Sequence, residues 1–268
     1  MGKYSGRMVY WNIITTLGKL KCMSDTTFRF RQFTVHQDKC AMKVGTDAVL
    51  LGSWINPGNA ELILDVGSGT GLIALMIAQK SIAEIDAIDI DENAYLQTKE
   101  NFRISPWFFR LHPIHRSFQQ YASESDKKYD LIVSNPPFFQ HASKPNEESR
   151  MNARHNDLLT FDEIIDGVRK LLNPNGEFVL ILPTKEGMDF MDKAQRKGLF
   201  CNHLVKIKTR SGKQEKRLIM KFGYRFSLLS EEEIVIQEED GTFTKEYIEL
   251  TSDYYIQLRS SPSVFPQS

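Results

Sequence analysis

The feature that most constrains the fold is a glycine-rich loop set between a buried strand and a helix. Residues 62–66 form a short apolar run, which is typical of a strand buried on both faces. The loop Asp65-Val-Gly-Ser-Gly-Thr-Gly71 follows, and helical character begins at Leu72. Glycine lets the backbone turn sharply and approach a ligand closely, and the free N–H groups of the next helix point at that ligand. Because both neighbours have the right type, a turn without a ligand is the weaker interpretation.

The alternation of strand and helix continues along the chain. Further strands are predicted at 84–88, 112–115, 129–134, 177–182, 204–207 and 217–224, and helices at 46–54, 72–80, 92–102 and 161–172. Alternating elements of this length predict an α/β fold with a doubly wound, mainly parallel sheet. Thr46 or Asp47 is expected to cap the first helix. Residues 28–35 alternate imperfectly and predict a strand or an extended arm.

An acidic residue supports a ligand at the glycine loop. Asp89 ends the apolar run at 84–88, and it lies about 20 residues beyond the glycines, where a carboxylate accepts hydrogen bonds from ribose hydroxyls. The glycine spacing differs from that of dinucleotide binders, and no Lys-Ser/Thr follows as in a phosphate loop. Between residues 40 and 225 the chain resembles the class I S-adenosylmethionine-dependent methyltransferases.

That resemblance implies a Rossmann-like fold with a doubly wound, mainly parallel, seven-stranded sheet and an antiparallel closing strand. It implies S-adenosylmethionine as cofactor, S-adenosylhomocysteine as product, and no metal. The residues implied to line the methionine moiety are Asp65, Gly67, Gly69 and Gly71. Asp89 is implied to hold the ribose. Where such enzymes usually carry an acid near the adenine, this chain has Ser117 and Phe118, which are expected to hydrogen-bond to the ring and to pack on it.

A second motif, Asn135-Pro-Pro-Phe138, follows the strand at 129–134. The amide oxygen of Asn135 can accept a hydrogen bond from an amino group, and Pro136 has only its carbonyl to offer. Fixed acceptors suit a reaction in which an attacking nitrogen gains positive charge. Phe138 offers a face on which a planar base can stack. The loop therefore predicts a site for direct attack by a planar amine, with Asn135, Pro136 and Phe138 as the catalytic groups.

This loop resembles the Asn-Pro-Pro-aromatic signature of methyltransferases that modify adenine, cytosine or guanine amines, or glutamine amides in release factors. Five flanking blocks resemble more narrowly the bacterial tRNA1(Val) (adenine(37)-N6)-methyltransferase family: residues 42–54, 105–107, 129–139, 150–155 and 243–255. The combined match runs from Phe28 to Tyr255. Phe138 stands where that family usually has tyrosine, which keeps the stacking face and removes a hydroxyl.

The narrower resemblance implies N6-methylation of the adenine at position 37 in the anticodon loop of a valine tRNA. Such a base must be splayed out of its stack to reach a pocket. Lys43, Thr46 and Asn135 are implied to lie at the cofactor. Substrate contacts are expected from Pro137, Phe138, Phe139, Arg150, Arg154 and His155. For the last three residues a simple helix-entry loop is an equal alternative.

Other functions remain open at this point. Guanine N2-methylation of ribosomal RNA uses the same loop, but such enzymes often carry a duplicated domain, and none is visible. Glutamine N5-methylation of a release factor would be expected with a separate N-terminal helical domain, which is also not visible. A binding module without catalysis is disfavoured because the glycine loop, Asp89 and Asn135 are all intact.

A basic stretch lies between residues 193 and 225. Its cations are Lys193, Arg196, Lys197, Lys206, Lys208, Arg210, Lys213, Lys216, Arg217, Lys221 and Arg225. Such a stretch either grips phosphates with salt-dependent affinity or forms a solvated face, and the sequence favours neither. The acidic stretch 231–239 is expected to balance charge or to cover an edge.

Composition excludes several classes of protein. The 34 basic and 34 acidic residues of the chain cancel, so net charge identifies no partner. The three cysteines, Cys22, Cys40 and Cys201, lack ligand spacing, which argues against a zinc site and fits a reducing, cytoplasmic compartment. No apolar run approaches the roughly 20 residues of a membrane helix. No membrane contact is therefore expected. The family resemblance implies a tRNA partner, and a monomer is expected.

Four segments are predicted. Residues 1–24 hold four basic residues and no acid, which fits a transit peptide or, as we favour, a disordered or non-native extension ahead of Met23. Residues 25–58 are expected to form an arm and a helix, and residues 59–227 the methyltransferase catalytic domain. Residues 228–268 are expected to form a tail that packs on that domain.

Overall fold

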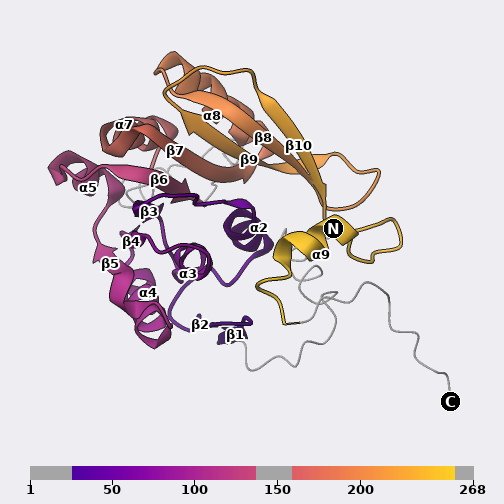
Figure 1. Ribbon diagram of the computed structural model, residues 1–268, viewed down its shortest axis with the longest axis horizontal. Coiled ribbons are helices and arrows are strands. Elements are labelled where there is room, and N and C mark those ends of the chain that lie inside the picture. The colour runs from indigo at the N-terminus through magenta and orange to yellow at the C-terminus, as the bar shows by residue number, and fades with distance from the viewer. Residues whose placement is uncertain (1–25, 137–158, 257–268) are drawn as a thin grey trace, which may run out of the picture.

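An eight-stranded sheet forms the centre of the computed structural model, which describes residues 26–136 and 159–256 (Figure 1). The strand order is β10-β8-β9-β7-β6-β3-β4-β5. The strands are β3 (Leu62–Val66), β4 (Glu84–Asp89), β5 (Leu111–His115), β6 (Tyr129–Ser134), β7 (Leu172–Pro183), β8 (Phe200–Lys208), β9 (Glu215–Gly223) and β10 (Ser230–Val235). Within this sheet β9 runs antiparallel to both neighbours, β7 and β8, and the other neighbouring strands are parallel.

The predicted doubly wound α/β fold with an antiparallel closing strand is confirmed, and one strand is added to it. The expected sheet had seven strands, whereas β10 supplies an eighth from the segment predicted to be a tail. The first four residues of β10 are exposed Ser and Glu, so no apolar alternation marks them as a strand. β10 forms because it pairs in parallel with β8, a contact between distant parts of the sequence.

Helices cover both faces of the sheet (Figure 1). One face carries α2 (Thr46–Trp54), α3 (Leu72–Gln79), α4 (Glu92–Ile104) and α9 (Lys245–Thr251). The other carries α5 (Phe118–Glu124), α7 (Phe161–Leu171) and α8 (Thr184–Arg196). A short 3₁₀ helix, η1 (Phe108–Arg110), precedes β5. The sequence did not predict α5, α8 or α9.

Two helix starts are built differently. α7 begins with a full capping box, in which Thr160 Oγ1 accepts from Glu163 N and the Glu163 carboxylate accepts from Thr160 N. At α2 the expected cap, Thr46 or Asp47, is wrong, because the cap residue is Gly45 and no side chain bonds to the helix start. The Asp47 carboxylate instead accepts from Arg217.

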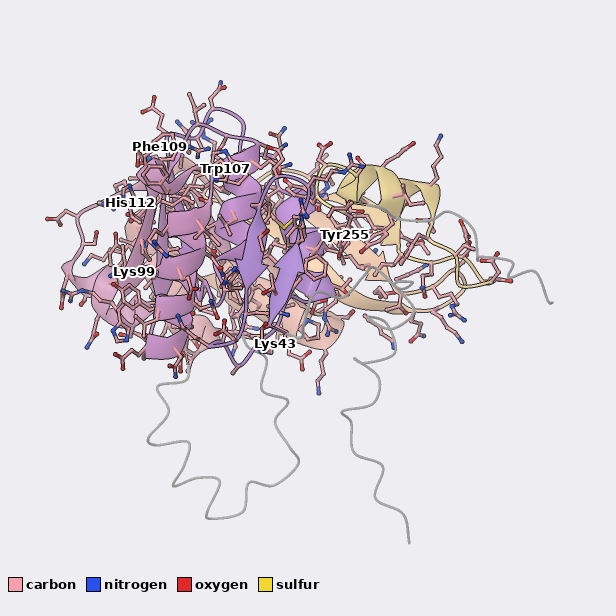
Figure 2. The ribbon with its side chains drawn as sticks, turned by 90° about the horizontal axis from the view of Figure 1, so that it is seen from below. Lys43, Lys99, Trp107, Phe109, His112 and Tyr255 are labelled. Atoms are coloured by element: carbon pink, nitrogen blue, oxygen red, sulfur yellow. The ribbon has the colours of Figure 1, made fainter. Side chains whose placement is uncertain are left out.

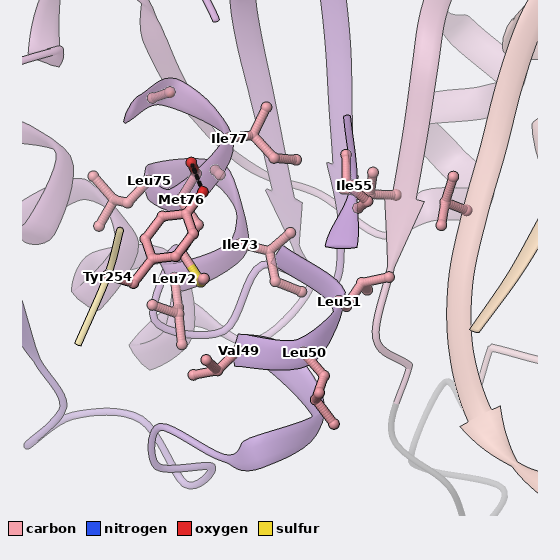
Figure 3. Packing of buried hydrophobic residues seen from close by; sticks show 14 of the residues in the cluster. Val49, Leu50, Leu51, Ile55, Leu72, Ile73, Leu75, Met76, Ile77 and Tyr254 are labelled. Carbon is pink, nitrogen blue, oxygen red and sulfur yellow. Dashed lines mark hydrogen bonds between the residues drawn. The ribbon is translucent and has the colours of Figure 1, made fainter. Parts of the chain in front are cut away.

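The packing of α2 on α3 forms much of one core (Figure 3). α3 is buried from Leu72 to Ala78, as expected of a helix enclosed on all sides. A Cβ placed on Gly52 of α2 would lie 2.6 Å from Met76 Sδ, so glycine permits this close approach. The Tyr254 hydroxyl donates to the Met76 carbonyl at 3.0 Å and ties the chain's last described turn to α3.

The arm predicted ahead of the domain is a hairpin of β1 (Thr27–Arg29) and β2 (Thr34–His36). It joins residues from the other end of the chain, since Arg31 N and Nε donate to the carbonyls of Tyr254 and Tyr255. The ring of Tyr255 also lies 6.0 Å from that of Phe30. In the part of the chain that the structure describes, no helix combines the length and apolar character that crossing a membrane would require.

Candidate active site

The glycine loop and Asn135 leave the sheet side by side. β3 lies between β4 and β6, so the chain winds outward in both directions from this point. Ligands of open α/β sheets bind at such a switch point, beyond the carboxyl ends of the strands. Val66 on β3 is paired with Ser134 on β6, and Ser134 Oγ donates to the Val66 carbonyl at 2.9 Å. Adjacent strands are about 4.8 Å apart, so Gly67 and Asn135 start from neighbouring positions.

Three glycines of the loop adopt left-handed backbone conformations, with φ of 75° at Gly67, 58° at Gly69 and 76° at Gly71. Residues with a Cβ rarely adopt such angles. At Gly71 a Cβ would also lie 2.7 Å from the Phe102 ring. At Gly67 no described atom lies within 4 Å of the Cβ position. The space over Gly67 is therefore open to a ligand. A side chain at this position would occupy that space.

Asp89, which was predicted to hold the ribose, is hydrogen-bonded to the glycine loop. Its Oδ2 accepts from Gly69 N at 2.8 Å, and its Oδ1 accepts from Asp91 N at 3.0 Å. Burial raises the pKa of Asp89, and these N–H bonds oppose the rise. Each carboxylate oxygen has a second lone pair, so Asp89 can still accept from hydroxyls of a ligand.

Asp65 is fully buried and incompletely bonded. Its Oδ2 accepts from Ala74 N at 3.3 Å, while its Oδ1 finds no partner among the described residues. Burial raises the pKa of Asp65 to about 7, opposed by the Ala74 N–H and reinforced by the charge of Asp89. A buried carboxylate with a free oxygen is well suited to accept from a cationic ammonium group.

The hydrogen-bond acceptors at this edge fit S-adenosylmethionine. The free Asp65 oxygen matches the ammonium of a methionine moiety, and Asp89 matches ribose hydroxyls. Gly67 N donates to the carbonyl of Ile88, the residue before Asp89, so the space over Gly67 lies near the carboxyl end of β4. Ile90, which follows Asp89, is an apolar side chain left 47% exposed at the same edge. The sequence did not single out Ile90, although its position directly after the acid could have done so.

Ser117 and Phe118 lie at the start of α5, close to the carboxyl end of β5. Ser117 Oγ accepts from Gln120 N at 3.2 Å, so that hydroxyl caps the helix. The Phe118 ring is 4% exposed and packs against Gly167 of α7 in the second core cluster. This placement leaves little of the ring for stacking on an adenine, because the ring packs against α7 at Gly167, where there is no side chain.

Lys43 and Thr46 precede the glycine loop in the sequence and lie beside α2. Lys43 is exposed, and its Nζ donates to the carbonyl of Gln37. It lies at the opposite end of the molecule from Trp107 and Phe109 in Figure 2. Thr46 is the first residue of α2 and is half-buried. The start of α2 is held by Asp47, whose Oδ2 accepts from Arg217 Nε at 2.8 Å.

The Asn-Pro-Pro-Phe loop is described only at its beginning. Asn135 is half-buried and Pro136 is buried, directly after β6. The other predicted residues of this region lie outside the described part of the chain: Pro137, Phe138, Phe139, Arg150, Arg154 and His155. The structure thus places Asn135 beside the glycine loop. The predicted substrate contacts of these six residues stay predictions.

Two buried polar side chains of α4 donate hydrogen bonds to carbonyls of the glycine loop. They were not identified from the sequence. Thr98 Oγ1 donates to the Gly69 carbonyl at 2.9 Å, and Asn101 Nδ2 donates to the Thr70 carbonyl at 2.8 Å. Both side chains are fully buried. Polar residues spaced by three on one helix face are usually taken as solvent-facing, which is why the pattern carried no signal.

The predicted basic stretch is extensively ion-paired. Pairs within 4.0 Å join Lys193 to Asp189, Lys197 to Asp162 and Asp166, Lys206 to Glu231, Lys208 to Glu233, Arg217 to Asp47, and Lys221 to Glu177. Two of the acids lie on β10, which covers the outer edge of β8. The acidic stretch therefore both balances charge and covers an edge, as expected. Phosphate binding by the basic stretch stays a prediction.

No group of three or more His, Cys, Asp or Glu side chains is placed to hold a metal ion within residues 26–136 and 159–256. The catalytic groups expected here, an amide oxygen and a carbonyl, act without one.

Comparisons with known proteins give consistent results. A family model described as "Methyltransferase small domain" matches residues 40–203. A relative from Trichodesmium erythraeum is 42% identical over 238 residues, which cover 88% of this chain and 100% of the relative. One from Flavobacterium johnsoniae is 44% identical over 234 residues, covering 86% and 100%. Both are named "tRNA1(Val) (adenine(37)-N6)-methyltransferase".

A solved structure supports the fold independently. A protein from Agrobacterium tumefaciens, described as "a predicted O-methyltransferase", superposes with a TM-score of 0.58 at 15% identity. The match covers 81% of this chain and 100% of that one. At this identity the likeness extends to the fold alone.

Proposed function

The chain belongs to the tRNA1(Val) (adenine(37)-N6)-methyltransferase family, and on that basis we propose how its residues carry out the reaction. It is an enzyme that transfers a methyl group from S-adenosylmethionine to the N6 amine of an adenine in tRNA. The observation that carries the residue assignment is the pairing of Val66 with Ser134. That pairing sets Asn135, the candidate amine acceptor, next to the glycine loop.

The cofactor half of the site is assigned to the carboxyl ends of β3 and β4. We assign the ammonium of the methionine moiety to Asp65 Oδ1 and the ribose hydroxyls to Asp89. Gly67 leaves room for the bound molecule, and the exposed Ile90 offers an apolar surface beside the ribose. When bound, S-adenosylmethionine supplies an electrophilic methyl group. The protein residues orient that methyl group and exclude water, as in other reactions governed by positioning.

The target amine is assigned to the loop after β6. The Asn135 amide oxygen and the Pro136 carbonyl accept hydrogen bonds from the N6 amino group, which turns its lone pair toward the methyl donor. As the nitrogen gains positive charge, both acceptors bind its hydrogens more strongly. The N–CH3 bond forms as the S–CH3 bond breaks, the sulfur of S-adenosylhomocysteine keeps the electron pair, and the nitrogen then loses one proton to water. We keep the prediction that Pro137, Phe138 and Phe139 stack on the base, and that Arg150, Arg154 and His155 contact RNA.

The names of the relatives decide between adenine and the alternatives. Asn135 and the glycine loop are equally compatible with guanine N2 or glutamine N5 methylation, because all three reactions present a planar amine. Relatives at 40–44% identity over most of the chain are named for adenine N6. No feature among the described residues favours ribosomal RNA or a release factor instead.

We propose a division of the chain into an extension (1–24), an arm with a helix (25–58), a catalytic domain (59–227) and a C-terminal segment (228–268). The prediction of a monomer is kept as a proposal. A cytoplasmic location is proposed because Cys40 and Cys201 are free thiols and the substrate is tRNA. The anticodon-loop position is proposed from the names of the relatives.

The direct test is methylation of total tRNA from a strain that lacks this gene, followed by nucleoside mass spectrometry. We expect new N6-methyladenosine that maps to position 37 of one valine tRNA. The control is the same tRNA taken from the parent strain, which should accept little further methyl. New N2-methylguanosine, or no methylated nucleoside at all, would remove the adenine assignment.

A further inference from the structure

Two buried polar side chains of α4 connect the glycine loop to the N-terminal arm. Thr98 and Asn101 are each 0% exposed and lie one helical turn apart, on the face of α4 that meets the loop. We propose that Thr98 and Asn101 are positioning residues that hold the glycine loop in the shape that binds S-adenosylmethionine. This inference rests on the proposed function. Neither residue is expected to touch the reacting atoms.

Thr98 contacts two residues of the loop and lies close to a third. Its Oγ1 donates to the Gly69 carbonyl at 2.9 Å and lies 3.1 Å from Ser68 Oγ. Its Cγ2 lies 3.2 Å from the position that a Cβ on Gly71 would take. A hydroxyl has one hydrogen to donate and lone pairs to accept with, so Thr98 can accept from Ser68 while donating to Gly69. One side chain thus supports the loop along most of its length.

Asn101 holds the next peptide group and also the arm. Its Nδ2 donates to the Thr70 carbonyl at 2.8 Å and to the His36 carbonyl at 2.8 Å. Its Oδ1 accepts from His36 N at 2.8 Å. All hydrogens of the amide group are therefore used, and the end of β2 is bonded in both directions to the side chain that supports the loop.

These bonds decide which way the loop's peptide groups face. In a trans peptide the carbonyl and the N–H point in opposite directions. Because the Gly69 carbonyl is turned to Thr98, the N–H of Thr70 is turned away from α4. Gly69, with φ of 58°, lies on one side of that peptide and makes rotation easier, since glycine has access to both hands of the backbone. Without α4 the loop would sample other peptide orientations, and binding would have to select one.

The test compares cofactor-site affinity with stability in single variants of the full chain. Thr98→Val keeps the side-chain shape and removes the hydroxyl. We expect it to weaken the binding of S-adenosylhomocysteine, measured by calorimetry, by about tenfold, the effect of one buried hydrogen bond. Thr98→Ser restores the hydroxyl and is expected to bind within about threefold of the unaltered chain. Asn101→Asp, which places an oxygen against the Thr70 carbonyl, should weaken binding at least as much as Thr98→Val.

Thr251→Val is the matched control. Thr251 is also 0% exposed, and its Oγ1 donates to the Tyr247 carbonyl at 2.7 Å within α9. Both valine variants are expected to lower the thermal unfolding midpoint by a similar amount. Only Thr98→Val should lose affinity for S-adenosylhomocysteine and raise the KM for S-adenosylmethionine, with kcat at saturation and the KM for tRNA little changed.

A merely structural role predicts a different pattern. If Thr98→Val binds S-adenosylhomocysteine within about twofold of Thr251→Val, whatever its unfolding midpoint, the positioning role is overturned. Should the added methyl prevent folding, Thr98→Ala removes the hydroxyl without added bulk and is judged by the same comparison. If the unaltered chain binds no S-adenosylhomocysteine, the proposed function fails. If the unaltered chain binds S-adenosylhomocysteine but the two valine variants have similar affinities for it, the positioning role of Thr98 is overturned and the proposed function stands.

Discussion

The glycine loop and the basic stretch between residues 193 and 225 were both singled out from the sequence, and the structure treats them differently. The loop lies between its strand and its helix as predicted, and the structure adds left-handed glycines, a bond from Gly69 N to Asp89 and an unpartnered oxygen on Asp65. Many cations of the basic stretch are paired with carboxylates, including two on β10. One region keeps an unpartnered polar atom at the edge of the sheet, and in the other many of the charges are already paired.

The difference teaches which sequence signals survive folding. A glycine required by a positive φ reports a property of the backbone at that residue, and no distant residue can supply it. A lysine in a sequence indicates only a charge, and the effect of that charge depends on which groups lie within a few ångströms after folding. The role of the glycine can therefore be predicted from its local sequence. The role of the lysine can be judged only once its neighbours in the folded structure are known.

Gly71→Ala should give the largest effect in the loop. The new Cβ would meet Phe102 at 2.7 Å and Thr98 at 3.2 Å, in a backbone conformation with φ of 76°. We expect a loss of about 3 kcal/mol in unfolding free energy from strain and overpacking together. Binding of S-adenosylhomocysteine should fall by at least about 100-fold, because the shift is transmitted into the loop.

Gly198→Ala is the matched control for backbone strain. Gly198 has φ of 74°, and a Cβ there would meet nothing within 4 Å. We expect a loss of about 1 kcal/mol and unchanged affinity for S-adenosylhomocysteine. Calorimetry measures the affinity and thermal unfolding the stability of both variants. An equal loss of affinity in Gly71→Ala and Gly198→Ala would show that cofactor binding does not depend specifically on the backbone of the glycine loop.

The second prediction concerns the pH dependence of cofactor-site affinity. Burial raises the pKa of Asp65 to about 7 in the free protein. An ammonium beside Oδ1 favours the carboxylate and lowers that pKa, so the bound state carries fewer protons. Affinity for S-adenosylhomocysteine should therefore be constant above about pH 7 and fall as pH drops below it, by up to about tenfold per unit. Calorimetry from pH 5.5 to 8 measures this.

Asp65→Asn provides the comparison for that pH profile. It removes the titrating group and should bind more weakly, with affinity nearly independent of pH over the same range. If the slope persists in Asp65→Asn, the proton belongs to another group, and the assignment of the ammonium to Asp65 is wrong.

The smallest effect is expected where the cations are already paired. The double variant Lys206→Gln and Lys208→Gln should change the KM for tRNA less than about twofold, because Glu231 and Glu233 neutralise both lysines. Stability should change little, since these pairs are partly exposed to solvent and such pairs contribute little. The variant Lys213→Gln with Lys216→Gln is matched in charge and alters cations for which the described residues provide no ion pair.

The salt dependence of tRNA binding sharpens this comparison. Each lost phosphate contact should reduce the slope of log affinity against log salt by about 0.7 to 0.9. If the Lys206 and Lys208 variant reduces the slope more than the Lys213 and Lys216 variant does, the ion pairs open to bind RNA. The contrast between the two regions of the molecule would then have to be withdrawn.

Much of the fold could be predicted because its signals are local. The run at 62–66, the glycines and the strand at 129–134 each carry their own pattern, and they appear as β3, the loop and β6. The pairing of Val66 with Ser134 then follows from the winding of a parallel sheet. The sequence therefore indicated both halves of the site before their contact was observed.

The parts that were missed depend on distant contacts. β10 begins Ser-Glu-Glu-Glu and becomes a strand only beside β8. Thr98 and Asn101 are polar residues on a helix, and their burial depends on the loop that lies against them. The Phe118 ring packs at Gly167 of α7, a neighbour that the sequence did not indicate. In each case the deciding neighbour is far away in the sequence.

The most direct test of the account is the variant Asn135→Ala, measured in two ways on one preparation. Calorimetry with S-adenosylhomocysteine should give an affinity close to that of the unaltered chain, because Asp65, Gly67 and Asp89 are untouched. Methyl transfer to tRNA should fall by at least about 100-fold, since the amine loses an acceptor that strengthens in the transition state. Near-normal turnover, or loss of S-adenosylhomocysteine binding in a folded variant, would contradict the assignment of Asn135 to the target amine.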